Sequence, residues 1–466
     1  MVLIAAVLAS AMGFIDSTVI AIAIPSMRDT LGASLPQAQW ISNAYMLTLS
    51  AFILVGGAFG DRFGLARMFS LGIVGFVLAS MACAFAPSPE FLVAARFFQG
   101  IGAALMVPGS MAIVARAYPR AERARAIGTW AAAASVSTAL GPIIGGLALT
   151  FGGAEMWRWI FAINLPFAAI ALWLLWRAIE RDAGRPGEQI DFIGAALAVI
   201  GLGLLAFGLT GAEGGGEIRL APCIAGAAIL ALFVWVEARI SAPMLDLGLF
   251  RDRTFAVVNL AIFLHWLGFI GVIFFLPVVL VGAWGLTEIT ASLALAPLSV
   301  FVGLLSRRTS GLAERYGPRL VLGFGMSIVA ISFFLLGAVA PRLDFWWGVL
   351  PAMIGIGFGM SFVAAPLSAT VMTAIDEQHS GTASGINNAV SRIGGLISIA
   401  ALGSLAASRY HSAGGTASFA QHSAPPSEVL ASTAGLVTIS WIAAGCAALA
   451  AALCLVTLPG RQPPAQ

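Results

Sequence analysis

A succession of long apolar segments, separated by short polar connections, runs along nearly the whole chain. A helix that crosses the bilayer core needs about 20 apolar residues, and breaks at charge clusters and at glycine or proline turns delimit fourteen such segments. Because lipid cannot satisfy exposed backbone groups, segments of this kind fold as helices. The sequence therefore predicts an all-α polytopic membrane protein with transmembrane helices at 2–25, 38–60, 68–86, 91–115, 126–150, 159–177, 192–211, 220–238, 254–281, 286–306, 320–340, 346–374, 383–408 and 429–457.

The composition excludes several classes of protein. Of the 466 residues 60% are hydrophobic and 10% are charged, against about 45–50% and about 25% in soluble domains. A soluble enzyme is therefore not expected, and the net charge of +3 is too small to indicate nucleic-acid binding. The four cysteines all lie inside apolar runs, where they are packing residues. We expect no metal and no cofactor.

The arginines predict the topology, since every basic residue is an arginine. Most of them lie in alternate connections, and cytoplasmic connections carry an excess of positive charge. The chain is accordingly expected to span a bacterial plasma (inner) membrane many times with both termini in the cytoplasm. Two arginines, Arg96 and Arg392, lie inside predicted helices instead.

Two connections repeat one pattern of an acid, an arginine, an aromatic residue and a glycine. The first copy runs from Asp61 and Arg62 to Gly64, and the second from Glu314 and Arg315 to Gly317. We expect each to form a short cytoplasmic loop. Internal repeats of bundles are typical of secondary transporters. The pattern predicts a six-helix bundle at 1–190, two linker helices at 191–240 and a second six-helix bundle at 241–466.

Several motifs, in order along the chain, resemble those of the major facilitator superfamily. The segment from Gly57 to Gly64 is similar to its loop signature, and the segment from Leu92 to Ala104 to its fourth-helix motif. Residues 16–25 and 157–166 resemble the fourteen-helix drug/proton antiporter subfamily (EmrB/QacA type). The resemblance implies the major facilitator superfamily fold and two bundles that alternate access to a substrate.

Asp16 is the one carboxylate deep inside a predicted span. A buried carboxylate in a membrane is a functional candidate by default. Desolvation favours its neutral form and a nearby cation its charged form, so such a group can load and release a proton. The expected partners are Arg96 and Gln99, which share one helix face. A structural carboxyl group and an arginine that reaches the surface are the alternatives.

The remaining motifs predict conformational roles. The resemblance implies that Gly57, Asp61, Arg62, Gly64, Glu314 and Arg315 form a latch that stabilises the outward-facing state, and the alternative is turn chemistry with positive charge anchored inside. Small residues recur every four positions at Ser137, Gly141 and Gly145, which predicts close helix packing. The resemblance implies that Gly141, Pro142, Gly145 and Gly146 are the antiporter motif and mark an exporter.

The substrate must be inferred from the scarcity of buried acids. A polycation would need several, whereas the chain offers 30 Phe, 12 Trp and 14 Met, which suit varied apolar shapes. Candidate cavity residues are Trp40, Asn43, Tyr45, His265, Trp266, Asn388 and Arg392. For His265 a packing role is the alternative, and for Arg392 an arginine that reaches the inner surface.

These observations predict a proton-coupled antiporter that exports hydrophobic or amphipathic organic compounds. Its expected partners are the small-molecule substrate, protons and the lipid bilayer, with a periplasmic adaptor protein if the cell has two membranes. A dedicated exporter of one metabolite or self-made antibiotic is the alternative, and sodium remains an alternative coupling ion. A membrane sensor or enzyme is the third reading, which the absence of a nucleotide-binding motif and of convergent catalytic groups disfavours.

Overall fold

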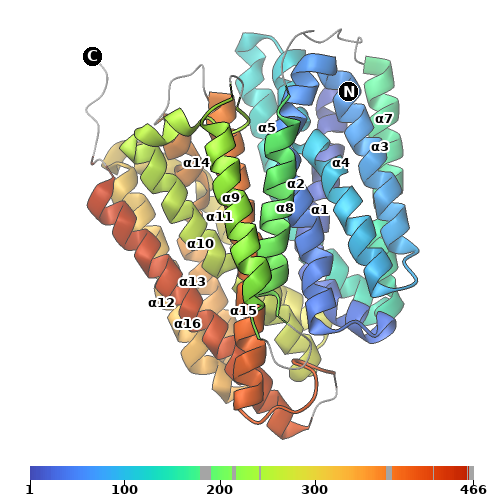
Figure 1. The fold of residues 1–466 in the computed structure, drawn as a ribbon, viewed down its shortest axis with the longest axis vertical. Helices are drawn as coiled ribbons and strands as arrows, with labels where there is room; N and C mark the ends of the chain where they lie inside the picture. The colour runs from blue at the N-terminus through green and yellow to red at the C-terminus, as the bar shows by residue number, and fades with distance from the viewer. Residues whose placement is uncertain are drawn as a thin grey trace. The chain divides into compact units, whose positions relative to one another are not determined.

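The computed structural model describes residues 1–178, 190–211, 217–240, 243–373, 380–422, 425–458 and 460. Every regular element in these ranges is a helix (Figure 1). The chain divides into two compact units, one comprising Met1–Leu205 and Leu220–Met244 and the other Ala206–Arg219 and Leu245–Gln466. The division at 1–190, 191–240 and 241–466 stays a prediction from the sequence.

The first unit holds the helices that carry most of the motifs. They are α1 (Val2–Leu31), α2 (Leu35–Phe63), α3 (Leu65–Ala84), α4 (Pro89–Ala117), α5 (Arg120–Gly152), η1 (Ala154–Met156), α6 (Trp157–Ala162), α7 (Asn164–Ala178), most of α8 (Phe192–Leu209) and α9 (Leu220–Glu237). Helix α1 packs against α4, α5 and α7, and α4 also packs against α2 and α3.

The second unit contains the elements of the C-terminal half. They are η2 (Leu247–Arg251), α10 (Arg253–Pro277), η3 (Val278–Ala283), α11 (Glu288–Tyr316), α12 (Pro318–Val339), η4 (Ala340–Arg342), η5 (Phe345–Val349), α13 (Leu350–Ser361), α14 (Ala364–Thr373), α15 (Ser380–Ser412) and α16 (Pro426–Thr457). Helix α16 packs against α10 and α12, and α15 packs against α10.

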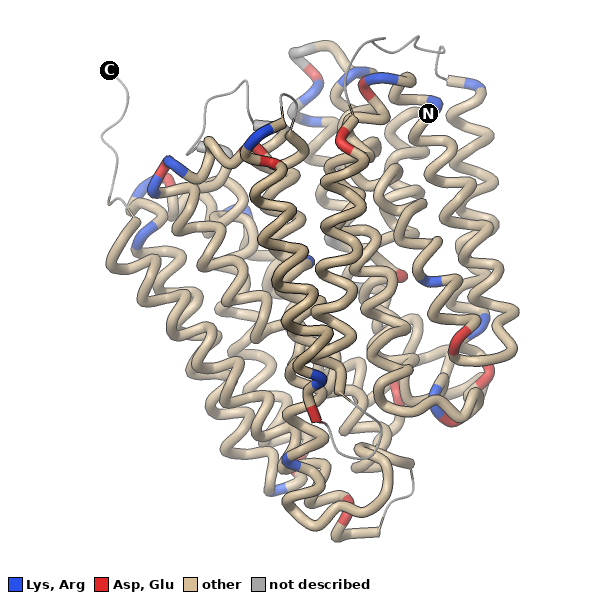
Figure 2. Tube along the Cα trace, in the orientation of Figure 1, with Lys and Arg blue, Asp and Glu red and all other residues tan. Residues whose placement is uncertain are grey.

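The predicted membrane spans are confirmed in number and type. Within the described residues fourteen helical stretches are long and apolar enough to cross a bilayer. Several reach beyond the predicted bounds, as in Leu35–Phe63 against 38–60, whereas Phe192–Leu209 is shorter than the predicted 192–211. Figure 2 shows that charged residues gather towards helix ends and that the middles are nearly free of them. Helices can continue past the apolar layer because water accepts their charged last turns.

The two repeated motifs are not loops, which corrects the expectation for Asp61, Arg62, Glu314 and Arg315. These residues lie in the last turns of α2 and α11, and a single glycine joins each helix to the next. Gly64 has φ of 97° and Gly317 has φ of 85°, values that side-chain-bearing residues rarely adopt. The glycine turns the chain in one residue, so no loop is needed, and the two copies share this backbone geometry.

Glycines on α4 let its neighbours approach closely. A Cβ atom on Gly100 would lie 2.5 Å from the Tyr45 carbonyl oxygen of α2, and one on Gly102 would lie 2.4 Å from the Phe76 nitrogen of α3. Such distances are possible only without a side chain. Helix α4 is thereby held close to both neighbours at the level of Gln99, which sets the position of the polar cluster described next.

Candidate functional site

Asp16 lies in the middle of α1 with 1% of its surface exposed. One of its oxygens, Oδ2, accepts a hydrogen bond of 2.6 Å from Arg96 Nη1 of α4, which is also 1% exposed. The predicted pair is therefore in contact. Leaving either charge without the other inside a protein would be strongly destabilising, so the two side chains depend on each other.

Arg96 is held by groups other than Asp16 as well. Its Nε donates to the Ile41 carbonyl oxygen of α2 at 3.1 Å. The guanidinium carbon lies 4.3 Å from the ring centre of Tyr45 and 5.7 Å from that of Phe161. Cation–π contacts of this kind stabilise a desolvated guanidinium. Arg96 is thus anchored to α2 and α6 independently of α1.

Gln99 connects the ion pair to a second layer of polar groups. Its Oε1 accepts from Arg96 Nη1 at 2.7 Å, and its Nε2 donates to Asp16 Oδ1 at 3.0 Å and to Ser80 Oγ at 3.4 Å. Ser80 of α3 also receives a 2.8 Å hydrogen bond from Asn164 Nδ2 of α7. We call Asp16, Arg96, Gln99, Ser80 and Asn164 the polar cluster.

The connection into α6 and α7 anchors this cluster from one side. Trp157 Nε1 donates to Thr30 Oγ1 of α1 at 2.8 Å. Arg158 Nη1 donates to the carbonyl oxygens of Ala84 and Ala86, where α3 ends. The same segment also carries two partners of Ser80. The Phe161 carbonyl oxygen accepts a hydrogen bond from the Ser80 hydroxyl, and the Asn164 side chain donates one to it. Sequence reasoning used this segment only as part of a resemblance and gave neither Ser80 nor Asn164 a role.

Helix α5 packs tightly on α1 beside the cluster. A Cβ atom on Gly141 would lie 2.3 Å from Thr18 Oγ1, and one on Gly145 would lie 2.2 Å from Val19 Cγ2. The small-residue stripe therefore faces α1, as the four-residue spacing predicts. Pro142 lies inside α5.

Comparison with known proteins identifies the family to which a chain with these helices belongs. The sequence model of the Major Facilitator Superfamily matches residues 6–399. The chain belongs to the Major Facilitator Superfamily. Transport across a membrane that the chain spans many times, rather than catalysis, is the activity that this superfamily membership indicates.

Relatives within the superfamily carry names that refer to drugs and antibiotics. The multidrug resistance protein Stp of Mycobacterium tuberculosis (strain CDC 1551 / Oshkosh) is 32% identical over 84% of this chain and 73% of its own length. The tetracenomycin C resistance and export protein of Streptomyces glaucescens is 32% identical over 85% of this chain and 73% of its own. A crystal structure of a D-xylose–proton symporter matches 98% of this chain and 97% of its own with a TM-score of 0.68 and 16% identity, which shows the shared superfamily fold.

The other predicted site residues of this superfamily member are distributed over both units. In the first, the Tyr45 ring lies against the Arg96 guanidinium, and Trp40 is half-buried. Asn43 is fully buried, and among the described residues neither its Nδ2 nor its Oδ1 has a hydrogen-bond partner. The acids Asp61 and Glu314 are exposed at helix ends.

In the second unit His265 is fully buried in α10. Its Nε2 lies 3.0 Å from Met360 Sδ, and its ring stacks on Phe269 at 5.8 Å between centres. Trp266 packs edge-on against both rings. On α15, Asn388 Nδ2 donates to the Ser384 carbonyl in its own helix, and Arg392 is half-buried. His265 thus contacts a thioether and two aromatic rings.

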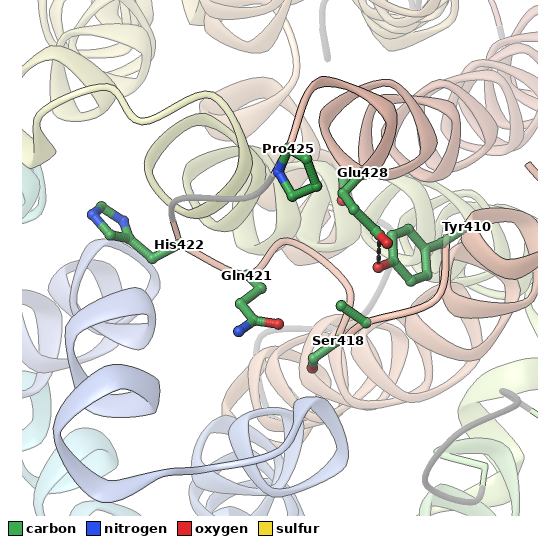
Figure 3. Close-up of a pocket in the computed structure, with 8 residues that line it drawn as sticks. Tyr410, Ser418, Gln421, His422, Pro425 and Glu428 are labelled. Atoms are coloured by element: carbon green, nitrogen blue, oxygen red, sulfur yellow. Dashed lines mark hydrogen bonds between the residues drawn. The ribbon is translucent and has the colours of Figure 1, made fainter. Parts of the chain in front are cut away.

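A cavity of about 170 Å³ lies where α15 and α16 meet their connection. Figure 3 shows Tyr410 and Glu428 facing each other on one side, with Ser418, Gln421, His422 and Pro425 around them. Glu428 accepts hydrogen bonds from the Tyr410 hydroxyl and from the nitrogen and hydroxyl of Thr416. The carboxylate thereby ties the connection to α16. None of these residues was predicted from the sequence to form a site. Glu428 lies at the edge of its predicted span, where a carboxylate is not unusual.

Proposed function

We propose that the chain is a proton-driven exporter of hydrophobic or amphipathic organic compounds that works by alternating access. The observation that carries the proposal is the buried Asp16–Arg96 contact at 2.6 Å in the middle of a membrane helix. An ionisable pair at that depth is the expected mark of a proton relay. Asp16 is the proton carrier in this proposal, and Arg96 and Gln99 set when it loads.

Charge balance couples the proton to a change of conformation. With Asp16 ionised, Arg96 and Gln99 both donate to it, so α1 is bound to α4. Protonation removes the negative charge to which both groups donate, so it weakens the link. Arg96 keeps its hydrogen bond to Ile41 and its ring contacts when this happens. Helix α1 is therefore the element that is released.

The direction and the substrate class rest on the motif in α5 and on the relatives. The Gly141–Pro142 motif resembles that of exporters, and the names of the relatives include multidrug resistance and antibiotic export. A panel of unrelated apolar compounds distinguishes multidrug export from the second candidate, a dedicated exporter of one self-made antibiotic. The tetracenomycin C protein favours that second candidate.

The rest of the transport cycle follows from the placement of charge. Gly57, Asp61, Arg62 and Gly64, with Glu314 and Arg315, act as the conformational latch on the cytoplasmic side of a plasma membrane, and both termini lie on that side. The proposed cavity residues are Trp40, Asn43, Tyr45, His265, Trp266, Asn388 and Arg392. In a cell with two membranes a periplasmic adaptor would complete the route.

Purified protein in vesicles with an imposed pH gradient tests this function. The compound panel contains ethidium, puromycin and tetracenomycin C, each assayed with and without a sodium gradient. We expect uphill movement driven by the pH gradient, and Asp16→Asn, which mimics a permanently protonated acid, should abolish it. Uphill export by Asp16→Asn at the wild-type rate would remove Asp16 from the mechanism, and drive by the sodium gradient alone would replace the proton with sodium.

A further inference from the structure

The hydroxyl group of Ser80 has one proton and three polar neighbours. The Phe161 carbonyl oxygen lies 3.0 Å away, Asn164 Nδ2 2.8 Å and Gln99 Nε2 3.4 Å. A carbonyl oxygen only accepts hydrogen bonds, so the Ser80 proton goes to Phe161. The oxygen of Ser80 then accepts from both amide groups, and its hydrogen-bonding capacity is filled.

This arrangement fixes which way the Gln99 amide faces. Its NH₂ group is directed to Ser80 and Asp16, and its oxygen to Arg96 and the Cys83 thiol. If the amide turned over, its oxygen would meet a Ser80 hydroxyl whose proton is already used. Its NH₂ group would meet Arg96, which is also a donor. Two buried mismatches would result, and each buried unsatisfied group is costly.

The fixed amide decides how Asp16 can take up a proton. A proton on Oδ1 needs an acceptor, and the Gln99 oxygen could serve only after the amide turned over. On Oδ2 the contacting group is Arg96 Nη1, which is a donor and cannot accept a proton's hydrogen bond. With the cluster intact, a proton on either oxygen finds no acceptor in Arg96 or Gln99 and removes the negative charge to which both donate. Proton uptake must then accompany the separation of α1 from α4.

We propose that Ser80 and Asn164 are positioning residues that hold the Gln99 amide as a donor to Asp16, so that Asp16 loads a proton only when α1 leaves α4. The proposal rests on the proposed proton coupling at Asp16. It assigns a purpose to the α6–α7 segment, because Phe161 and Asn164 both come from it. In the state described, Trp157 joins that segment to α1 and Arg158 joins it to the end of α3.

Within the part of the chain that the structure describes, three ionisable side chains from neighbouring helices belong to or contact the polar cluster. Arg96 comes from α4, the Cys83 thiol from α3 and the Tyr45 phenol from α2. Helix α5 has no ionisable residue between Arg125 and its end at Gly152, and α7 has none before Arg177. Arg158, at the start of α6, is paired with Glu155. A change in pH dependence therefore reports on the cluster itself.

The test compares the pH profile of ethidium–proton exchange in vesicles for the wild type and Ser80→Ala. Alanine removes one of the two mismatches that oppose turning of the Gln99 amide, the one at Ser80, so the amide turns more readily to accept the proton of a protonated Asp16. One net hydrogen bond then favours the protonated form, which moves the profile by about 0.5–1 pH unit towards alkaline pH. Asn164→Ala should move it in the same direction by less, because the Ser80–Phe161 bond remains.

Two comparisons separate positioning from stability. Ser70→Ala is the matched control, since Ser70 is on the same helix and its hydroxyl donates to the Ala66 carbonyl; its profile should equal that of the wild type. Ser80→Ala in a Gln99→Leu background should move the profile no further than Gln99→Leu alone, because Ser80 acts through Gln99. A Ser80→Ala variant that is slower at every pH with an unmoved profile would overturn the proposal.

The outcome for Asp16→Asn keeps the two proposals distinguishable. If that variant is inactive and Ser80→Ala has the wild-type profile, proton coupling stands and the positioning role falls. If wild-type vesicles export no compound of the panel, or Asp16→Asn exports at the wild-type rate, both fall. Should ethidium not be carried, the reporter is the panel compound that wild-type vesicles do export.

Discussion

At the scale of single residues, Arg96 does more than supply a positive charge. It donates to Asp16, to Gln99 and to a backbone carbonyl, and it lies against two aromatic rings. A planar guanidinium can make these contacts together, whereas a lysine ammonium is a point charge on a flexible stem. The contacts made at this position therefore depend on the planar shape of the guanidinium group as well as on its charge.

Arg96→Lys should accordingly behave as a loss of function, although the charge is kept. We expect exchange to slow by about tenfold or more, since a hydrogen bond to a charged group contributes about 1.5–3 kcal/mol and about 1.4 kcal/mol changes a rate tenfold. Initial rates in vesicles measure this. Arg177→Lys, at an exposed position on α7, is the control and should transport normally. Normal rates in Arg96→Lys would show that charge alone is sufficient.

The residues that sequence reasoning found here are those whose chemistry is unusual for their surroundings. An acid and an arginine inside apolar spans stand out, so Asp16 and Arg96 were predictable. Ser80 and Asn164 were not, because serine and asparagine are ordinary in helices and their partners lie about 80 residues away in the chain. Tyr45 was placed in the substrate cavity from its helix alone, and only the fold reveals its contact with Arg96.

At the scale of elements, the α1–α5 contact depends on missing side chains. Gly141→Ala should destabilise the protein by about 1–3 kcal/mol, the usual effect of overpacking, because the new methyl group would meet Thr18 Oγ1 and the backbone of Ile15. Thermal unfolding of the purified protein followed by tryptophan fluorescence measures the change.

Gly128 provides the matched comparison on the same helix. A Cβ atom there would meet nothing within 4 Å, and alanine is favoured over glycine in a helix by about 0.5–1 kcal/mol. Gly128→Ala should therefore unfold at the same or a higher temperature. If Gly141→Ala were equally tolerated, the close contact of α5 with α1 would be wrong. Gly153 is not a neutral reference, since its φ of 86° strains any other residue.

Apolar runs locate helices well and their ends poorly. The boundary of an apolar run marks where lipid contact stops, and α2 and α11 continue for further turns into the charged motifs. The sequence therefore predicted loops at Asp61 and Glu314 where the chain is helical. Gly64 and Gly317 were visible in the sequence, but their φ angles, which remove the need for a loop, were not.

At the scale of the whole molecule, the arginine pattern makes a prediction that labelling can check. Ala413 and Arg319 are exposed and lie in connections predicted to be on opposite sides of the membrane. In a Cys223→Ser, Cys446→Ser background, an impermeant maleimide should label Ala413→Cys in intact cells. Arg319→Cys should react only after permeabilisation. The reverse pattern would invert the topology, and labelling of the background alone would void the comparison between the two sites.

The two glycine links have a mechanical consequence for each unit. A join of one residue offers two rotatable backbone bonds and no slack, so the adjoining ends of α2 and α3 stay within a few ångströms of each other, as do those of α11 and α12. Sliding of one helix past its neighbour is thereby excluded at these ends, whereas tilting is allowed. Each pair is therefore two helices hinged at one end. A change in the angle between α2 and α3 must occur by rotation at Gly64, and a change between α11 and α12 by rotation at Gly317.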